Sequence, residues 1–221
     1  MRYTTLIPLT VILLSGCFSE KKVVKDENNN TTTTTTKRPD NEVYPIKLNN
    51  RQKIVYKKVE EYLNRLKSLD VEGTISMTYP KFFTVFNKNT YRSQLMTMTN
   101  SSNIDIIDFS AKITQIGKID KFENGEFTTV EYTSTIKVYL KNSRLYNTPQ
   151  SINTLYSILV RKYGRENIHV DTTTRVVTII KQEKLLAIKE SSKDWKFIGD
   201  NQTYRKVYYP RFLPIEILNR I

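Results

Sequence analysis

The sequence predicts an α+β domain in which a curved antiparallel sheet wraps round N-terminal helices. Two observations lead to this fold class. In the first part of the folded region apolar residues recur at helical spacing, and in the second part they alternate with polar residues at strand spacing. Helices followed by a run of antiparallel strands are typical of α+β architecture. Residues 51–221 are long enough to form one such domain with its own core.

Three helices are expected at the start of this domain. The apolar positions of the first helix recur at alternating steps of four and three residues, at Val55, Val59, Tyr62, Leu66 and Leu69. A second, short helix over 71–79 is stopped by Pro80, because proline lacks the backbone N–H that a helix needs. A compact aromatic stretch over 81–86 precedes a third, weaker helix over 89–100.

Two long strands are expected next. Apolar and polar residues alternate over 107–114 and again over 130–140, so that one face of each strand is apolar. The dipeptide Asn124-Gly125 between them is a turn signal, which predicts that the two strands form a hairpin. A helical pattern over 149–164 then interrupts the strands.

The rest of the domain returns to strand patterns. They cover 168–180 and 184–189, and the polar residues 181–183 are expected to form a break between two strands. Residues 195–198 form either the end of the last strand or a short strand of their own. A short helical segment is expected after Pro214.

The first 16 residues have the three parts of a secretory signal peptide. Arg2 supplies positive charge, the run 6–14 is apolar, and Ser15 and Gly16 are small residues that suit a cleavage site. A membrane-spanning helix needs about 20 apolar residues, so this run is too short to span a bilayer. The only cysteine of the chain, Cys17, follows directly.

The segment Leu14-Ser15-Gly16-Cys17 resembles the lipobox of bacterial lipoproteins. The resemblance implies cleavage before Cys17 and a diacylglyceryl lipid on its sulfur, usually with a third fatty acyl chain such as palmitate on the new amino terminus. Each buried CH₂ of a lipid chain contributes about 0.8 kcal/mol, so several chains would anchor the protein to a membrane of the cell envelope. The next residue, Phe18, is not the aspartate that retains lipoproteins in the inner membrane, which favours the outer membrane. An ordinary signal peptide with a chance cysteine is the alternative.

Residues 17–50 are expected to form the lipidated end and a disordered tether. The stretch is rich in asparagine and threonine, with a threonine run over 31–36, and shows no apolar periodicity. Such a segment cannot bury enough apolar surface to offset the entropy lost on ordering. Once Cys17 is lipidated no thiol remains, so the domain is expected to fold without a disulfide.

The formal net charge is +13, and the excess of basic residues is spread over the folded part. Nucleic acid is not expected as a partner, because an exported and lipid-anchored protein meets little of it. Anionic lipid headgroups or acidic envelope polymers are nearer neighbours. Solubility alone is the simpler explanation of the charge.

The order of elements resembles that of the nuclear transport factor two-like superfamily, whose fold is a cone-shaped α+β domain. The resemblance covers roughly 51–200 and depends on four features: the first helix ending at Leu69-Asp70, the Tyr79-Pro80 break, the two long strands, and the closing block 185–198. It implies a cavity inside the cone, whereas the helix over 149–164 departs from the family pattern. Because such folds host many functions, the resemblance does not imply an activity.

Catalytic residues are weakly indicated. The single histidine, His169, lies two residues from Asp171, so that both would face the same side of a strand and could act as an acid–base pair. A solvent-facing strand edge is the alternative. Asp105 and Asp108 would point to opposite faces of a strand, which argues against paired carboxylate chemistry. With one histidine and no spare thiol we expect no metal site, and without a glycine-rich phosphate loop we expect no cofactor.

Aromatic residues are more prominent. The chain has 14 tyrosines, 9 phenylalanines and 1 tryptophan. Candidates for lining a pocket that binds a small apolar or sugar-like ligand are Tyr62, Tyr79, Phe82, Tyr132 and Trp195. Plain core packing is the alternative. The segment 204–209 mixes rings with basic residues and is expected to be an exposed strand or loop, or a contact for a polyanion or protein partner.

The sequence therefore favours an envelope-anchored lipoprotein that binds a ligand or an envelope protein without catalysis. A small cavity enzyme, a hydrolase or isomerase with His169 or a buried aspartate as base, is the alternative. A structural subunit of an envelope complex, using aromatic residues of 204–213, is a third hypothesis. No motif in the sequence decides among the three.

Overall fold

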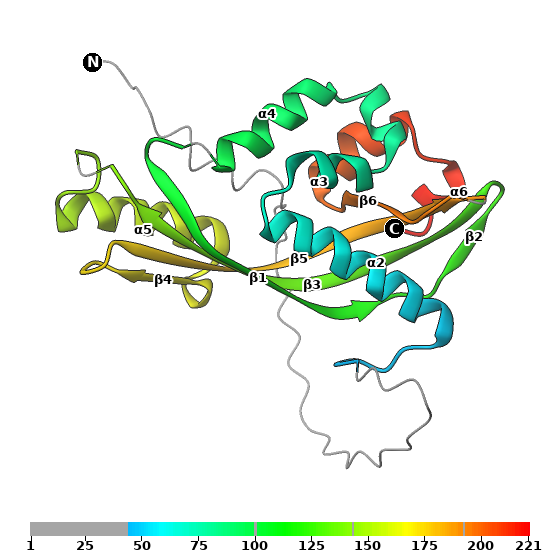
Figure 1. Ribbon diagram of the computed structural model, residues 1–221, viewed down its shortest axis with the longest axis horizontal. Helices are drawn as coiled ribbons and strands as arrows, with labels where there is room; N and C mark the ends of the chain where they lie inside the picture. The colour runs from blue at the N-terminus through cyan, green and yellow to red at the C-terminus, as the bar shows by residue number, and fades with distance from the viewer. Residues whose placement is uncertain (1–43, 100, 143, 192) are drawn as a thin grey trace, which may run out of the picture.

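A computed structural model describes residues 44–99, 101–142, 144–191 and 193–221 (Figure 1). The predicted signal peptide over 1–16, the predicted lipid-attachment residue Cys17 and the predicted tether up to residue 43 lie outside the described residues. Three apolar side chains of the remaining tether, Tyr44, Ile46 and Leu48, pack against the core cluster of the first described helix. The packed part of the chain therefore starts before residue 51.

The three predicted helices are confirmed as α2 (Asn50–Lys67), α3 (Val71–Met77) and α4 (Lys88–Thr99). Helix α2 begins with a capping box, in which the side chains of Asn49 and Gln52 each accept the other's backbone N–H. The aromatic stretch between α3 and α4 contains a short 3-10 helix, η1 (Pro80–Thr84). The described fold therefore begins with helices, as the apolar periodicity predicts.

Within the described residues, six antiparallel strands form one sheet. They are β1 (Ile104–Ile116), β2 (Asp120–Phe122), β3 (Gly125–Leu140), β4 (Ile168–Asp171), β5 (Val176–Glu190) and β6 (Lys196–Gly199). The long strands β1, β3 and β5 lie side by side in that order, while β4 and β6 pair with opposite ends of β5. Two register shifts interrupt the pairing of β1 with β3, and such bulges bend a strand. The sheet curves round the N-terminal helices (Figure 1), which confirms the predicted α+β class.

The predicted break at 181–183 is wrong. Strand β5 is continuous and pairs with β3 without a register shift, so that Lys181 lies opposite Ser134. The turn lies earlier, over 172–175, where Asp171 accepts backbone N–H groups and Arg175 has a φ of 57°. Three consecutive polar residues are typical of a loop. In β5, however, pairing with β3 satisfies their backbone N–H and C=O groups, so the polar side chains do not interrupt the strand.

Helix α5 (Pro149–Tyr163) forms where the sequence predicts it and ends at Gly164, whose φ of 88° suits glycine. Its apolar face packs on one end of the long strands, in a cluster that contains Ile136 and Ile179. Helix α2 packs near the other end, in a cluster that contains Val130 and Leu185. Because side chains alternate along a strand, both helices cover the same face of the sheet.

The C-terminal segment covers the opposite face at the α2 end. It consists of a turn of π-helix η3 (Tyr204–Tyr208), a 3-10 helix η4 (Tyr209–Arg211) and a short helix α6 (Ile215–Leu218). Its rings join a third cluster with Phe82 and Leu186. The predicted exposed strand or loop over 204–209 is therefore wrong, because the segment is helical and its rings are packed into the fold.

Candidate functional site

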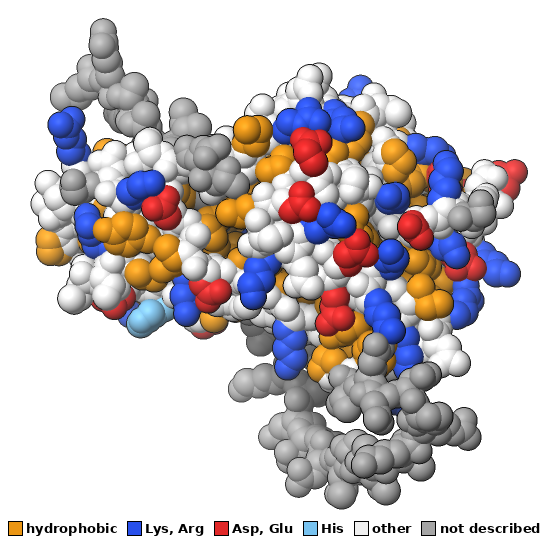
Figure 2. Space-filling view, viewed as in Figure 1, with side chains coloured by type: hydrophobic (Ala, Val, Ile, Leu, Met, Phe, Trp, Pro, Cys, Tyr) orange, Lys and Arg blue, Asp and Glu red, His pale blue; other side chains and the backbone are white. Residues whose placement is uncertain are grey.

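A cavity of about 100 Å³ lies on the sheet face between the regions that α2 and α5 cover, and α4 closes over it. Its walls come mainly from α2, α4 and the three long strands, with further residues from η1, β6 and η3, and include Leu66, Leu95, Met98, Ile106, Phe109 and Ile136. At about 10–15 Å³ for each water, the space would hold several waters or the inserted part of a small ligand. Figure 2 shows apolar side chains in the groove between the α5 end of the molecule, at the left, and the helices at the right.

One buried ion pair lines this cavity. Lys181 and Glu183 are two residues apart on β5 and point to the same face. Lys181 Nζ donates to Glu183 Oε1 at 2.6 Å, and the two side chains are only 5% and 11% exposed. Ser134 Oγ on β3 donates to Glu183 Oε2 at 2.8 Å. Both carboxylate oxygens are therefore engaged, whereas this bond uses one of the three N–H donors that an ammonium group carries.

Two further residues lie behind this pair, at the end of α5. The ring of Tyr163 has Lys162 Nζ 5.3 Å and Lys181 Nζ 6.0 Å from its centroid. Burial, with the nearby charge of Glu183, raises the pKa of the Tyr163 hydroxyl, which has no hydrogen-bond partner among the described residues. Burial and repulsion by Lys181 lower the pKa of Lys162. We call Ser134, Lys162, Tyr163, Lys181 and Glu183 the polar cluster.

Aromatic rings form the opposite part of the wall. Phe82 stacks on Tyr204 with ring centroids 5.5 Å apart, and meets Tyr91 edge to face at 5.9 Å. Burial raises the pKa of Tyr62 and of Tyr91 above the ordinary value of a tyrosine. Because these rings already pack against one another, this wall does not need a ligand in order to form.

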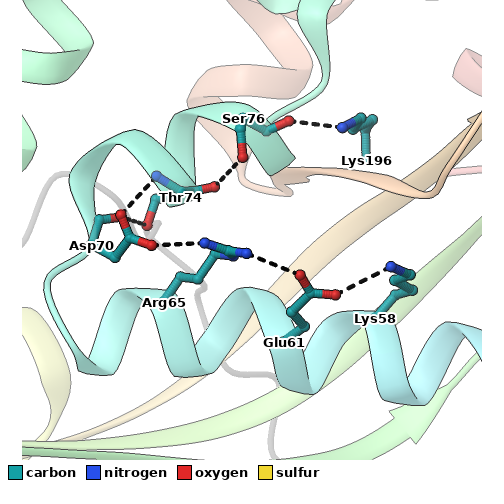
Figure 3. A network of polar contacts seen from close by, with 8 residues as sticks. Lys58, Glu61, Arg65, Asp70, Thr74, Ser76 and Lys196 are labelled. Atoms are coloured by element: carbon teal, nitrogen blue, oxygen red, sulfur yellow. Dashed lines mark hydrogen bonds and ion pairs between the residues drawn. The ribbon is translucent and has the colours of Figure 1, made fainter.

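The turn between α2 and α3 supports the α2 side of the cavity (Figure 3). Leu69, a lining residue, has a φ of 55°, which leucine adopts only where the surroundings hold it. Next to it, Asp70 accepts from Arg65 Nη1 at 2.7 Å and from the backbone N–H of Gly73 at 2.8 Å, capping α3. A Cβ atom at Gly73 would lie 2.0 Å from Asp70 Oδ2, so a larger residue there would have to displace the Asp70 side chain.

The structure brings together three of the five predicted pocket residues. Tyr62, Phe82 and Tyr132 line the cavity. Tyr79 does not line it; its ring is buried in the cluster with the C-terminal segment, and its hydroxyl donates to Glu190 at 2.7 Å. Trp195 also lies elsewhere, buried in the core beneath α2. For these last two residues the alternative of core packing holds.

The residues weighed for catalysis lie away from this cavity. His169 is exposed on β4 and borders a separate, open depression against α5. Asp171 Oδ1 accepts the N–H groups of Thr173 and Thr174. The side-chain hydroxyl of Thr174, together with these backbone hydrogen bonds, lowers the pKa of Asp171. Its carboxylate thus organises the turn between β4 and β5. Among the described aspartates, Asp200 is buried, but it is held by Arg205 at 2.6 Å and is not among the residues that line the cavity.

Asp105 and Asp108 are surface residues in separate ion pairs, with Lys141 at 2.9 Å and Lys137 at 3.5 Å. The prediction that the two side chains point to opposite faces of the strand is wrong: a register shift between Ile106 and Asp108 places Asp105 opposite Tyr139 and Asp108 opposite Lys137, two β3 residues on one face of the sheet. Each carboxylate is engaged by its own lysine. Within the ranges that the structure describes, no group of three or more His, Cys, Asp or Glu side chains could hold a metal ion. No helix in those ranges is both long and apolar enough to span a membrane.

Sequence reasoning missed Lys181 and Glu183. A signal was present, because Ile179, Lys181, Glu183 and Leu185 continue the alternation of β5 on its apolar face. Two charged residues in phase with apolar neighbours indicate a strand that passes a polar site on its buried side. Treating 181–183 as a break hid this phase.

No protein-family model matches the sequence, and a search of curated proteins finds no match. Among solved structures, the chain is similar to a ketosteroid isomerase-like protein from Erwinia carotovora atroseptica, with 10% sequence identity and a TM-score of 0.42. The match covers 68% of this chain and 93% of that protein's chain. The geometry of the cavity therefore carries the functional conclusion.

Proposed function

We propose that this domain binds a small, mostly apolar ligand in the cavity closed by α4, and that it does so without catalysis. One observation carries the proposal: a cavity of about 100 Å³ walled by packed aromatic rings also holds a buried ion pair. A concave apolar site with a few convergent polar groups is the usual form of a ligand pocket. Apolar burial would supply affinity, and the polar groups would orient the ligand.

A cavity-filling substitution tests the proposal. Leu95→Trp on α4 would place an indole in the space, because Leu95 lines the cavity. The matched control is Met96→Trp on the same helix, since Met96 is 45% exposed and is not a lining residue. Native mass spectrometry of the full chain, expressed in bacteria and released from detergent, is expected to show a retained small molecule. The added mass should disappear in Leu95→Trp and persist in Met96→Trp. If neither variant loses it, the molecule binds elsewhere and this proposal fails.

We also propose that the chain is a lipoprotein of the bacterial cell envelope, anchored by lipid on Cys17 and held in the outer membrane. The support is the sequence of the leader, in which Leu14-Ser15-Gly16-Cys17 follows a short apolar run. Cells fed radiolabelled palmitate should label the wild-type protein, and Cys17→Ser should abolish the label and release the protein from the membrane fraction. Ser19→Ala is the control. Equal labelling of the Cys17→Ser variant would exclude this anchor.

A cavity enzyme, a hydrolase or isomerase, is the second candidate. The observation that favours it is Glu183, a carboxylate at the cavity wall. Both oxygens of Glu183 already accept hydrogen bonds, from Lys181 and Ser134. Protonating Glu183 would leave the buried ammonium group of Lys181 without its counter-charge, which favours binding over proton abstraction. A retained molecule that leaves the purified protein chemically changed would favour the enzyme instead.

We propose, last, that the domain is a divergent member of the nuclear transport factor two-like superfamily. Three leading helices and a curved antiparallel sheet support this assignment, and α5 between β3 and β4 departs from the family pattern.

A further inference from the structure

The polar cluster bears on which ligand the cavity accepts. Replacing a buried ion pair by apolar residues of similar volume is often neutral or stabilising, so a pair such as Lys181–Glu183 is weak evidence for stability. Between Val177 and Ala187 the other β5 residues on this face are apolar, with Val177 and Ile179 on one side of the pair and Leu185 and Ala187 on the other. A charged pair within this apolar stretch, at the point where the sheet meets a cavity, is suited to binding a polar group of a ligand.

Hydrogen-bonding capacity points to an acceptor. Glu183 accepts one hydrogen bond on each oxygen, from Lys181 and Ser134, so neither oxygen lacks a partner. Lys181 has three N–H donors, of which the bond to Glu183 uses one, and its side chain is 5% exposed. A buried donor without an acceptor is costly, and a ligand oxygen at the cavity wall would satisfy it.

Charge points to an anion rather than to a neutral acceptor. The ammonium groups of Lys162 and Lys181 lie 5.3 Å and 6.0 Å from the centroid of the Tyr163 ring. The lowered pKa of Lys162, which has burial and repulsion by Lys181 as its causes, shows that the two cations lie close enough to disfavour each other. A negative charge beside Lys181 would relieve this repulsion, and a second positive charge would increase it.

The remaining walls of the cavity indicate the chemical nature of the rest of the ligand. Beyond the ion pair they are mainly apolar, with Met98, Ile106, Phe109 and Ile136 near the sheet. An inorganic anion would leave these walls without a partner, whereas a hydrocarbon body would bury against them.

We propose that the ligand is an organic monoanion with an apolar body, such as an alkyl carboxylate, whose oxyanion accepts hydrogen bonds from Lys181 Nζ while the body lies against the apolar wall. This inference rests on the ligand-binding function proposed above and specifies the chemical class of the ligand. Lys181 binds the head group, Glu183 and Ser134 hold Lys181 in place, and Lys162 adds positive charge behind it.

Three probes of equal chain length test the proposal: octanoate, 1-octanol and octylamine. Calorimetric titration of the full chain carrying Cys17→Ser, in buffer without detergent, is expected to show octanoate binding at least about tenfold more tightly than octanol, the least that a charge-assisted hydrogen bond would give. Octylamine should bind more weakly than either. Equal affinities for octanoate and octanol, or a preference for the amine, would overturn the proposal.

A double variant separates the site from the general attraction of a basic protein for anions. Lys181→Met/Glu183→Gln removes one positive and one negative charge, so the net charge of +13 is unchanged. The preference for octanoate over octanol should fall to about one, while octanol binding stays within about threefold because the apolar wall is intact. A preference that survives in this variant would place the anion elsewhere and refute the assignment to Lys181.

Failure of the anionic ligand class and failure of ligand binding itself would give different results. If octanol binds as tightly as octanoate, and Leu95→Trp abolishes binding of both, the cavity binds ligands but the anionic class is wrong. If none of the three probes binds and the purified full chain carries no added mass, the ligand-binding function itself is wrong.

Discussion

Replacing Lys181 alone with methionine is expected to destabilise the fold strongly. The substitution keeps the apolar volume of the stem but leaves the Glu183 carboxylate, 11% exposed, without its cation. With Nζ and Oε1 2.6 Å apart, the lost attraction is about 6 kcal/mol at an effective dielectric constant near 20. The hydrogen bond from Ser134 remains, and water in the cavity rehydrates part of the carboxylate. We therefore expect a loss of about 3–5 kcal/mol in the free energy of unfolding.

The double variant Lys181→Met/Glu183→Gln should be more stable than the single variant, although it carries one more substitution. It removes the orphaned charge, and the new amide oxygen can still accept from Ser134. Its cost relative to wild type is expected to stay below about 2 kcal/mol. Urea unfolding of the full chain, followed by circular dichroism and the fluorescence of Trp195, measures both values, provided that the slope with denaturant does not change.

Two results would refute this reasoning. If Lys181→Met costs less than about 1 kcal/mol, the carboxylate is solvated well enough to need no cation, as at a protein surface. If the costs of Lys181→Met and Glu183→Gln add in the double variant, the two groups do not interact energetically, and the short contact is not a stabilising pair.

Two further predictions concern the frame around the cavity. Gly73→Ala should lower the urea midpoint, because the new methyl group would displace the Asp70 carboxylate that caps α3. Alanine ordinarily stabilises a helix interior by about 1 kcal/mol over glycine, so the expected effect has the opposite sign. A raised midpoint would contradict this prediction. Burial acts to raise the pKa of Glu190, but hydrogen bonds from Lys81 and Tyr79 outweigh it, so that the pKa lies below its usual value. The stabilisation from Glu190 is therefore present above the unfolded pKa of about 4.3 and is lost as the pH falls through the lower folded value. Unfolding free energies should differ by about 1.5–3 kcal/mol between wild type and Glu190→Gln at pH 7 and converge below pH 4, and a difference that stays constant down to pH 3 would exclude this role.

Local pattern was sufficient for most of the elements. The helix through Val59 and Tyr62, the long strand through Val130 and Tyr132, and the late helix ending at Gly164 are all present. Each is a continuous stretch in which apolar side chains repeat with the period of one structure, so neighbours in the sequence suffice to predict it. The same reasoning failed at 181–183, because a run of polar residues resembles a loop whenever the partner strand is unknown.

Part of the candidate site was also predictable. Tyr62, Phe82 and Tyr132 could be selected as aromatic residues on apolar faces, and they line the cavity. Tyr79 and Trp195 satisfied the same criterion and are buried in core clusters instead. An aromatic residue on an apolar face becomes buried whether it lines a cavity or packs in the core. The position of the elements that cover it decides which of the two occurs.

The sequence by itself determined the α+β class and the order of helices and strands, because those depend on periodicities that each segment carries alone. Tertiary structure decided that Lys181 and Glu183 form a buried pair. Their charges are visible in the sequence, but their desolvation depends on α4 closing over the sheet and on α2 and α5 covering either side. A surface ion pair and an ion pair buried beside a cavity can consist of the same two residue types. They differ in how much water the surrounding parts of the chain exclude from the two charges.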